Sequence, residues 1–336
     1  MQELRRDPVL GRWIIVYFDR IKTPEDFSSH SVGTRKKAHI CPFCAGNETK
    51  TPPEIYVDRT PGSQPNAPGW NLRVIANKFP ALRIEGDLDR RGVGVYDFMN
   101  GVGAHEVIIE TPNHDKDIAE LNEEEVGKII LAYKHRCIDL KKDKRFEYIL
   151  IFKNHGESAG ASLEHSHSQL IALPIVPKKA KEALESAMRY YKFKERCVYC
   201  DIISQELEDK ERVIAENEHF ISFAPFASCS PFETRIIPKE HCAQFYHLRE
   251  EAIGTFASIL QDTLLRLKKV LTDPPFNFII NTAPIQQSGE LEYYHWHIEI
   301  VPKLTKVAGF EWGSGFYINP SPPEKAAQWL KEMKIK

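Results

Sequence analysis

The sequence predicts an α+β fold made of two similar halves in tandem, with mainly antiparallel strands and helices packed on them. One observation is that a pattern of two thiols, a lone histidine and an alternating histidine pair occurs twice in the 336 residues. A second is that each half contains one long amphipathic segment followed by two strand-like segments. The two copies are Cys41-Pro-Phe-Cys44, His114 and His165-Ser-His167, then Cys197-Val-Tyr-Cys200, His241 and His295-Trp-His297.

The spacing of landmarks supports a duplicated domain. A phenylalanine stands 19 positions before the first histidine of each pair (Phe146 and Phe276), and a glutamate stands 8 positions before each lone histidine (Glu106 and Glu233). The neighbouring segments also support a duplication, since RFEYILIFKN resembles PFNFIINTAP and NLRVIANKFPAL parallels EHFISFAPFAS. Chance similarity between strand patterns is the alternative, which the preserved offsets disfavour. We therefore place the two domains at residues 1–190 and 191–336.

The elements of the first half follow from local patterns. Residues 107–110 form a short apolar strand, and residues 122–141 form a helix that Asn122 can cap and whose first turn carries three glutamates. Its apolar face is formed by Val126, Ile129, Ile130 and Tyr133. Two strands follow at residues 146–152 and 165–173, and alternation places His165, His167 and Gln169 on one face of the second strand.

The second half repeats this order with a helix at 249–271 and strands at 276–280 and 295–301. A basic segment at 178–196 predicts a linking helix with a solvated face, and the Pro- and Gly-containing segments 51–70 and 319–323 predict loops. Because each half would leave a sheet edge exposed, we expect the halves to pair into one continuous sheet.

Composition limits the function classes. The formal net charge is −2, so the chain lacks the overall positive field of nucleic-acid-binding proteins. No apolar run approaches the roughly 18 residues of a membrane-spanning helix, and the N-terminus lacks a signal-peptide core. Four of the seven cysteines form CxxC pairs, which in an intracellular chain indicates metal or redox chemistry. We expect a cytoplasmic protein with no membrane partner.

The residues shared by both copies predict two structural zinc sites. Zinc takes four nitrogen or sulfur ligands in a closed tetrahedral site, and two thiolates with two imidazoles leave no position for water. The alternatives are redox-active or merely buried CxxC pairs, and His105 or His219 in place of the lone histidines, which the repeat disfavours. The sequence does not choose between zinc and iron for the second site. The predicted ligands are Cys41, Cys44, His114 and His165, then Cys197, Cys200, His241 and His295.

His167 is the predicted nucleophile. With His165 assigned to metal, His167 is free on the same strand face, after a Gly- and Ser-rich loop at residues 154–162. That loop can direct backbone N–H groups and the Ser162 hydroxyl at a phosphate, and Gln169 can donate to a phosphoryl oxygen. A neutral imidazole beside a phosphate site can carry a nucleotidyl group between two acceptors.

The second copy lacks this loop. Its equivalent segment, residues 282–293, is acidic and has one glycine, and Glu299 stands where the first copy has Gln169. A carboxylate would repel a phosphate. We therefore predict that the second half is non-catalytic and that His297 is a core residue.

At this point the sequence resembles a known family. HxHxQ preceded by a Gly/Ser loop is the signature of the histidine-triad superfamily, and a duplicated form with CPFC near the N-terminus resembles the galactose-1-phosphate uridylyltransferase family. The resemblance runs through nearly the whole chain. It is carried by RDPVLGRWIIV, CPFCAGNE, RVIANKFPAL, NHGESAGASLEHSHSQ, HWHIEIVP and VAGFEWGSGF.

The resemblance implies two histidine-triad-like halves and a ping-pong uridylyl transfer in galactose metabolism. His167 would attack the α-phosphorus of UDP-glucose, and galactose 1-phosphate, a hexose 1-phosphate, would accept the uridylyl group. It also implies a homodimer in which the partner chain completes each active site. By motif match, Asn154, Gly160, Ser162 and Gln169 would hold the phosphoryl groups, Asn77 and Phe79 the nucleotide, Arg20 the phosphates and Glu311 the hexose.

Departures from the family pattern leave a second function open. Ser166 and Ser168 stand where enterobacterial members have Pro and Gly, and those members lack the second CxxC. Both features are similar to a sister branch that includes ADP-glucose phosphorylases, in which adenylyl transfer to phosphate replaces uridylyl transfer. A zinc-dependent nucleic-acid-binding module is a remote alternative that the net charge disfavours.

Overall fold

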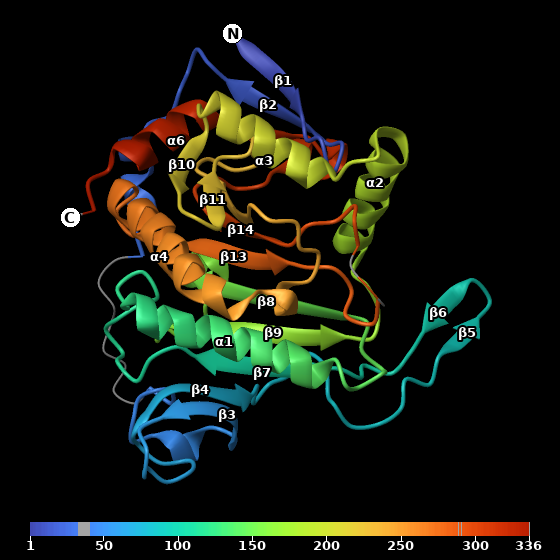
Figure 1. Ribbon diagram of the computed structural model, residues 1–336, viewed down its shortest axis with the longest axis vertical. Coiled ribbons are helices and arrows are strands. Elements are labelled where there is room, and N and C mark those ends of the chain that lie inside the picture. Colours follow the sequence, from blue (N-terminus) through green and yellow to red (C-terminus); the bar gives the residue numbers. More distant parts are fainter. Residues whose placement is uncertain (33–40, 288, 290, 336) are drawn as a thin grey trace.

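One antiparallel sheet runs through the computed structural model, which describes residues 1–32, 41–287, 289 and 291–335 (Figure 1). Its ten described strands are hydrogen-bonded in the order β10-β11-β12-β14-β13-β8-β9-β7-β4-β3. In that order they are Val213–Glu216, Phe220–Phe223, Thr234–Pro238, His297–Pro302, Phe276–Asn281, Tyr148–His155, His167–Leu173, Ala104–Ile109, Trp70–Ala76 and Glu54–Arg59. The predicted α+β class is confirmed.

The two halves meet at the centre of this sheet. Strand β13 pairs antiparallel with β8, with Phe276 opposite His155 and Ile280 opposite Ile151. Of the described strands, five come from each half, and their order from the junction outward is the same in both. The expected pairing of the two halves into one continuous sheet is therefore confirmed.

The strand register corrects one equivalence that was inferred from spacing. Val107 lies opposite Gln169, and Arg235 lies opposite Glu299. Since Gln169 and Glu299 are equivalent positions of the two histidine pairs, Val107 corresponds to Arg235. The glutamates matched by spacing are thus one position out of register, because the loop between this strand and the lone histidine differs by one residue.

A second equivalence shifts by three residues. In the first half, Phe152 lies opposite Gln169, and continuing this antiparallel register by two residues brings Asn154 opposite His167. In the second half, Asn281 lies opposite His297. Asn154 and Asn281 are therefore equivalent, and the phenylalanines that seemed equivalent by spacing are not. The sequence-based match followed an apolar pattern that recurs along both strands, whereas the ladder fixes the register by hydrogen bonds.

Two equivalent helices, α1 (Glu123–Leu140) and α4 (Ile253–Val270), lie side by side over one face of the sheet (Figure 1). The Asn122 side chain accepts a hydrogen bond from the Glu125 backbone N–H at 2.9 Å, as the sequence predicts for a cap. The core cluster joins both helices to strands of both halves. The four predicted apolar residues of α1, namely Val126, Ile129, Ile130 and Tyr133, are all buried.

Two connecting segments differ from expectation. The segment 51–70 was predicted as a loop, but it contains strand β3, which is held on the sheet edge by pairing with β4. The linking helix α2 (Lys178–Lys194) forms as predicted, and a helix that was not predicted, α3 (Val198–Asp209), begins inside the second CxxC. Edge strands and short helices receive much of their stability from tertiary contacts, so their local sequence signal is weak.

Smaller elements complete the molecule. Strands β1 (Gln2–Arg6) and β2 (Trp13–Tyr17) form a three-stranded sheet with β15 (Tyr317–Asn319). A hairpin of β5 (Arg91–Val93) and β6 (Tyr96–Phe98) projects from the body (Figure 1). Within the described residues, the other α-helices are α5 (Gly309–Ser314) and α6 (Pro323–Glu332). Over the described ranges, no helix combines the length and apolarity that crossing a bilayer would require.

Candidate active site and metal centres

The structure brings together both predicted sets of metal ligands. In each set, one ligand atom from each residue lies within 4.8 Å of the others. In the first set, the Cys44 Sγ lies 3.4 Å from His114 Nδ1 and 3.6 Å from His165 Nδ1. A tetrahedral zinc ion with ordinary bond lengths separates sulfur and nitrogen ligands by about 3.5 Å. The first set therefore has the donor types and spacing of a structural metal site.

The second set has the same geometry. The Cys200 Sγ lies 3.4 Å from His241 Nδ1 and 3.7 Å from His295 Nδ1. The His241 Nε2 lies 3.0 Å from the Leu291 carbonyl oxygen. A carbonyl oxygen can only accept, so Nε2 carries the proton and Nδ1 presents its lone pair to the thiols. Such carbonyl contacts orient histidine ligands in metal sites.

The same tautomer argument separates the two histidines of the first pair. The His165 Nε2 lies 2.7 Å from the Thr111 carbonyl, which leaves its Nδ1 for the metal cluster. The His167 Nδ1 lies 2.8 Å from the His165 carbonyl, so it is Nδ1 that holds the proton and Nε2 that keeps the lone pair. Two histidines on one strand face thus present opposite nitrogens. His165 fits a ligand, and His167 fits a nucleophile.

His167 lies at the wall of a cavity of about 410 Å³. Its side chain is only 6% exposed, and burial lowers the pKa of its imidazole. The ring of Phe43, from the first CxxC, meets it edge-on at 5.3 Å. A neutral imidazole with one directed lone pair at a ligand-sized cavity is the arrangement that nucleophilic attack requires.

Five of the residues predicted for catalysis or substrate binding line this one cavity. Gln169 stands beside His167 on β9, and its Oε1 accepts a hydrogen bond from His105 Nε2 at 2.8 Å. The Ala81 N–H donates to His105 Nδ1 at 3.0 Å, which fixes that tautomer. The Gln169 carbonyl is therefore occupied, and its NH₂ group remains as a donor. The five residues are Asn77, Phe79, Ser162, His167 and Gln169.

The remaining predicted phosphoryl contacts lie in the adjoining loop. Asn154 is at the end of β8, and its Nδ2 donates to the Gly160 carbonyl at 3.3 Å. Gly156 and Gly160 have φ values of +82° and +92°, which the turn requires and which side chains disfavour. Two glycines at positive φ thus allow the loop to curve back beside His167.

Arg20 and Glu311 are placed elsewhere. Among the described residues that line the His167 cavity, neither is present. Arg20 is exposed after β2, and the Glu311 Oε2 accepts from the Ala308 N–H at 3.0 Å as a cap of α5. The same chain therefore does not bring these two predicted substrate contacts to His167.

Behind the histidine strand lies a buried polar cluster. The Lys153 amine donates to Glu110 at 2.6 Å and to the His167 carbonyl at 3.1 Å. Ser166 donates to the same Glu110 oxygen at 2.6 Å, and Ser168 accepts from the Tyr133 hydroxyl at 2.6 Å. The two serines between and after the histidines are therefore partners of this cluster, which holds the strand from its rear face.

The corresponding position in the second half is closed. The Glu299 carboxylate forms ion pairs with Lys179 of α2 at 2.8 Å and with Arg235 at 3.1 Å. Burial would raise the pKa of Glu299, but Lys179, His297 and Arg235 outweigh burial and hold the pKa well below its usual range. The space beside His297 is only about 20 Å³. An ion-pair cluster therefore occupies the place of the open site.

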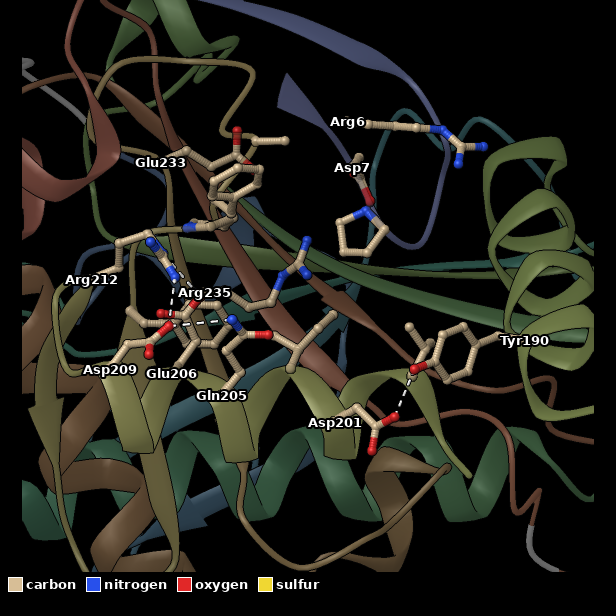
Figure 2. A pocket seen from close by; sticks show the side chains of 17 residues that line it. Arg6, Asp7, Tyr190, Asp201, Gln205, Glu206, Asp209, Arg212, Glu233 and Arg235 are labelled. Atoms are coloured by element: carbon tan, nitrogen blue, oxygen red, sulfur yellow. Dashed lines mark hydrogen bonds and ion pairs between the residues drawn. The ribbon is translucent and has the colours of Figure 1, made fainter. Parts of the chain in front are cut away.

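A separate cavity of about 540 Å³ lies between α3 and the N-terminal segment around Asp7 (Figure 2). Its wall contains Phe223 and Arg235, which lie opposite each other on neighbouring strands. The wall of the His167 cavity contains the equivalent pair, Ile75 and Val107. The lining of the separate cavity carries both charges, with five carboxylates and three arginines, and the Asp201 carboxylate accepts from the Tyr190 hydroxyl at 2.7 Å. Its wall thus uses equivalent positions of the sheet, but among the described residues neither His297 nor Glu299 lines it.

Several site residues were not predicted from the sequence. His105, a rival metal ligand on the sequence alone, instead donates to Gln169 and orients it. Lys153, Glu110 and Tyr133 form the cluster behind β9, and Asn277 contacts the loop that precedes His167. The sequence did carry one signal of the correct strand register. An asparagine begins both the NHG segment (residues 154–156) and the NTA segment (residues 281–283), and matching them aligns Asn154 with Asn281.

Comparison with known proteins places the chain in a family. Residues 1–177 match the family described as galactose-1-phosphate uridyl transferase, N-terminal domain, and residues 102–334 match a domain of unknown function (DUF4921). The ADP-glucose phosphorylase of Arabidopsis thaliana is 40% identical over 99% of this chain and 93% of its own length. The galactose-1-phosphate uridylyltransferase of Thermotoga maritima is 28% identical over 100% of this chain and 99% of its own.

Solved structures agree with this placement. The crystal structure of an ADP-glucose phosphorylase from Arabidopsis thaliana with bound ADP-glucose has a TM-score of 0.83 at 38% identity and covers 100% of both chains. A uridylyltransferase structure has a TM-score of 0.76 at 27% identity, covering 98% of this chain and 97% of that one. The chain therefore belongs to the galactose-1-phosphate uridylyltransferase family of nucleotidyltransferases.

Proposed function

We propose that the protein transfers a nucleotidyl group from a nucleotide sugar to a phosphate-bearing acceptor through a covalent intermediate on His167. The observation that carries this proposal is the Nδ1 hydrogen bond to the His165 carbonyl at 2.8 Å, which leaves the Nε2 lone pair of a buried, neutral imidazole. A nucleophile fixed in one tautomer loses no orientation at the moment of attack.

The proposed reaction has two balanced steps. Nε2 forms a bond to the α-phosphorus, the bond from that phosphorus to the bridging oxygen breaks, and hexose 1-phosphate leaves with the electron pair. An acceptor phosphate oxygen then attacks the same phosphorus, and the P–Nε2 bond breaks to regenerate neutral His167. The Gln169 amide, the Ser162 hydroxyl and the Asn154–Gly160 loop would donate to the phosphoryl oxygens, where negative charge develops.

We propose ADP-glucose as the donor and inorganic phosphate as the acceptor, giving ADP and glucose 1-phosphate. The 40% identity to an ADP-glucose phosphorylase along nearly the whole chain supports this assignment. Ser166 and Ser168 also support it. They stand where enterobacterial members have Pro and Gly, and both form hydrogen bonds in the polar cluster behind the strand.

Uridylyl transfer from UDP-glucose to galactose 1-phosphate is the second candidate. Its support is the full-length match to a uridylyltransferase of Thermotoga maritima and the family match over residues 1–177. Both candidates use the same nucleophile, so they differ only in the base and the acceptor.

One experiment tests the mechanism and the substrate together. The protein is incubated with ADP-glucose or UDP-glucose and no acceptor, and the intact mass and peptide masses are measured. We expect an acid-labile adenylyl adduct on His167 that phosphate discharges as ADP. A uridylyl adduct discharged by galactose 1-phosphate would instead establish the second candidate, and no adduct with either donor would exclude the mechanism.

We propose that both Cys₂His₂ sets bind zinc and act structurally. Two thiols and two imidazoles complete a tetrahedron, so no position is left for a reacting water. The first set contains His165, and its filling would fix the strand that carries His167. Metal analysis of the purified protein distinguishes zinc from iron at the second set.

We propose that a second copy of the chain supplies Arg20 and Glu311 to each active site, since neither reaches the cavity of its own chain. Mixing inactive His167→Ala with Glu311→Ala protein tests this. Heterodimers would contain one site with both residues intact, so activity should return on mixing. A monomer by light scattering, or no recovery after subunit exchange, would contradict the proposal.

A further inference from the structure

The loop that precedes His167 is held by a residue of the opposite half. Asn277 lies on β13, where it is paired with Asn154 across the junction of the two halves. Its amide Nδ2 donates to the Asn154 Oδ1 at 2.8 Å and to the Ala159 carbonyl at 2.8 Å. A primary amide has two N–H donors, so both are used on this loop.

These contacts determine how the Asn154 amide is oriented. With Oδ1 accepting from Asn277, the Asn154 Nδ2 faces the opposite way and donates to the Gly160 carbonyl at 3.3 Å. Its second N–H is not used by these contacts, and Asn154 lies two positions after Phe152 just as His167 lies two positions before Gln169, the residue opposite Phe152, so this N–H is left for the site. If Asn277 were absent, the amide could flip and present a carbonyl oxygen to an incoming phosphate, which would repel it.

Other residues that lead into β13 contact the same loop. His155 Nε2 lies 3.0 Å from Asp273, and its ring stacks on Phe276 at 4.9 Å. A Cβ on Gly156 would lie 2.9 Å from the Pro275 side chain, so the loop is closely packed against this segment. The second half therefore contacts the loop on several sides. Asn277 provides hydrogen bonds, which fix the direction of the groups they join.

From these contacts we infer that Asn277 is a positioning residue of the reaction. It belongs to the half without an open histidine site, and it orients Asn154 and the Ala159 carbonyl so that the loop presents donors to the transferring phosphoryl group. The inference rests on the proposed nucleotidyl transfer and adds a role for the second half in that chemistry.

The test compares Asn277→Ala and Asn277→Asp with Asn281→Ala. Aspartate keeps the size of asparagine but cannot donate, and Asn281 is the same residue type on the same strand beside the closed site. We expect the rate of adduct formation to fall about 10- to 100-fold in both Asn277 variants, with donor affinity changed by less than about 3-fold. Asn281→Ala should keep the wild-type rate.

A double-mutant cycle distinguishes positioning from general loss of structure. If Asn277 acts through Asn154, the Asn277→Ala change should have little further effect in an Asn154→Ala background. Rates that fall by the same factor in both backgrounds, or a wild-type rate in both Asn277 variants, would overturn the inference.

Hydrogen exchange gives a reading that does not depend on activity. Amides of residues 156–161 should exchange faster in the Asn277 variants than in the wild type and in Asn281→Ala. If the wild-type protein forms no adduct with either donor, the proposed function fails while this measurement still tests the contact. Unchanged exchange in this loop would overturn the inference even if the enzyme is active.

Discussion

At the residue scale, the backbone assigns different chemistry to two identical side chains. His165 and His167 lie two positions apart on one strand face, yet each donates to a different carbonyl oxygen. His165 donates from Nε2 to Thr111, and His167 donates from Nδ1 to His165 itself. Since a neutral imidazole has one N–H and one lone pair, each carbonyl decides which nitrogen is available. One histidine is left to face the cysteines and the other to face the cavity.

This division predicts different outcomes for single substitutions. His167→Ala should abolish adduct formation but retain metal content and unfold within a few degrees of the wild type. His165→Ala and Cys41→Ser should lose one metal per chain and more than about 4 kcal/mol of stability, because metal binding is coupled to folding. Metal analysis and thermal unfolding check this. An equal loss of melting temperature in all three variants would contradict the division.

Burial of His167 also predicts a pH dependence. The lowered pKa means that the imidazole stays neutral to a lower pH than an ordinary histidine, whose pKa is about 6.5. As pH falls to about 6.5, adduct formation should therefore retain more than half of its maximal rate. Single-turnover rates between pH 5 and 8 measure this. A midpoint of loss above the ordinary histidine pKa would show that the imidazole is not the limiting group.

At the scale of elements, strand β9 is held on both faces. One face carries His167 and Gln169 to the cavity, and the other carries Ser166 and Ser168 to the buried cluster around Lys153. A strand exposes alternate residues to opposite faces, so the HSHSQ pattern fixes both the site and its support. The serines that depart from the enterobacterial pattern are thus explained by their partners in the fold.

The buried ion pair in this cluster gives a stability prediction. Lys153→Met leaves the Glu110 carboxylate buried and unpaired, which should cost about 3–5 kcal/mol. Lys142→Met is the control, because the Lys142 amine pairs with Asp139 at 3.1 Å but its side chain is 74% exposed. That change should cost less than about 1 kcal/mol. Urea unfolding compares the two, and a similar cost for both would mean that the buried pair is not needed.

At the scale of the whole molecule, the two halves share one framework and differ at the histidine that is not a predicted metal ligand. Both halves keep the Cys₂His₂ set, the histidine strand and the covering helix, and they share one sheet. The first half has a cavity of about 410 Å³ at its free histidine, whereas the second has about 20 Å³ there. Lys179 and Arg235 fill the second position with an ion-pair cluster around Glu299. We propose that only the first half reacts.

That asymmetry predicts how the second half responds to change. His297→Ala should retain adduct formation on His167, since His297 has no open cavity beside it. Cys200→Ser should lose one metal per chain and lower the melting temperature, while the first metal remains. Metal stoichiometry, thermal unfolding and adduct mass together check these outcomes. An adduct on His297 in the wild-type protein would show that the second half also reacts.

The sequence by itself was sufficient for the parts that depend on residue type and spacing. The repeat identified the eight metal-ligand candidates, all of which the structure brings into two groups. Helix and strand periodicity predicted α1, α4 and the strands of the histidine pairs, because these elements are long and their apolar faces recur regularly. Even the single continuous sheet followed from the expectation that free edges pair.

Tertiary structure decided what depends on register and on contacts between distant segments. The apolar repeat of a strand fits several offsets, so only the hydrogen-bonded ladder paired Asn154 with Asn281 as equivalents and placed Val107 with Arg235. Spacing also could not show that Asn277, more than a hundred residues downstream, reaches the loop before His167, nor that a lysine of α2 closes the second site. Local patterns determine which residues are present, and long-range packing determines which of them meet.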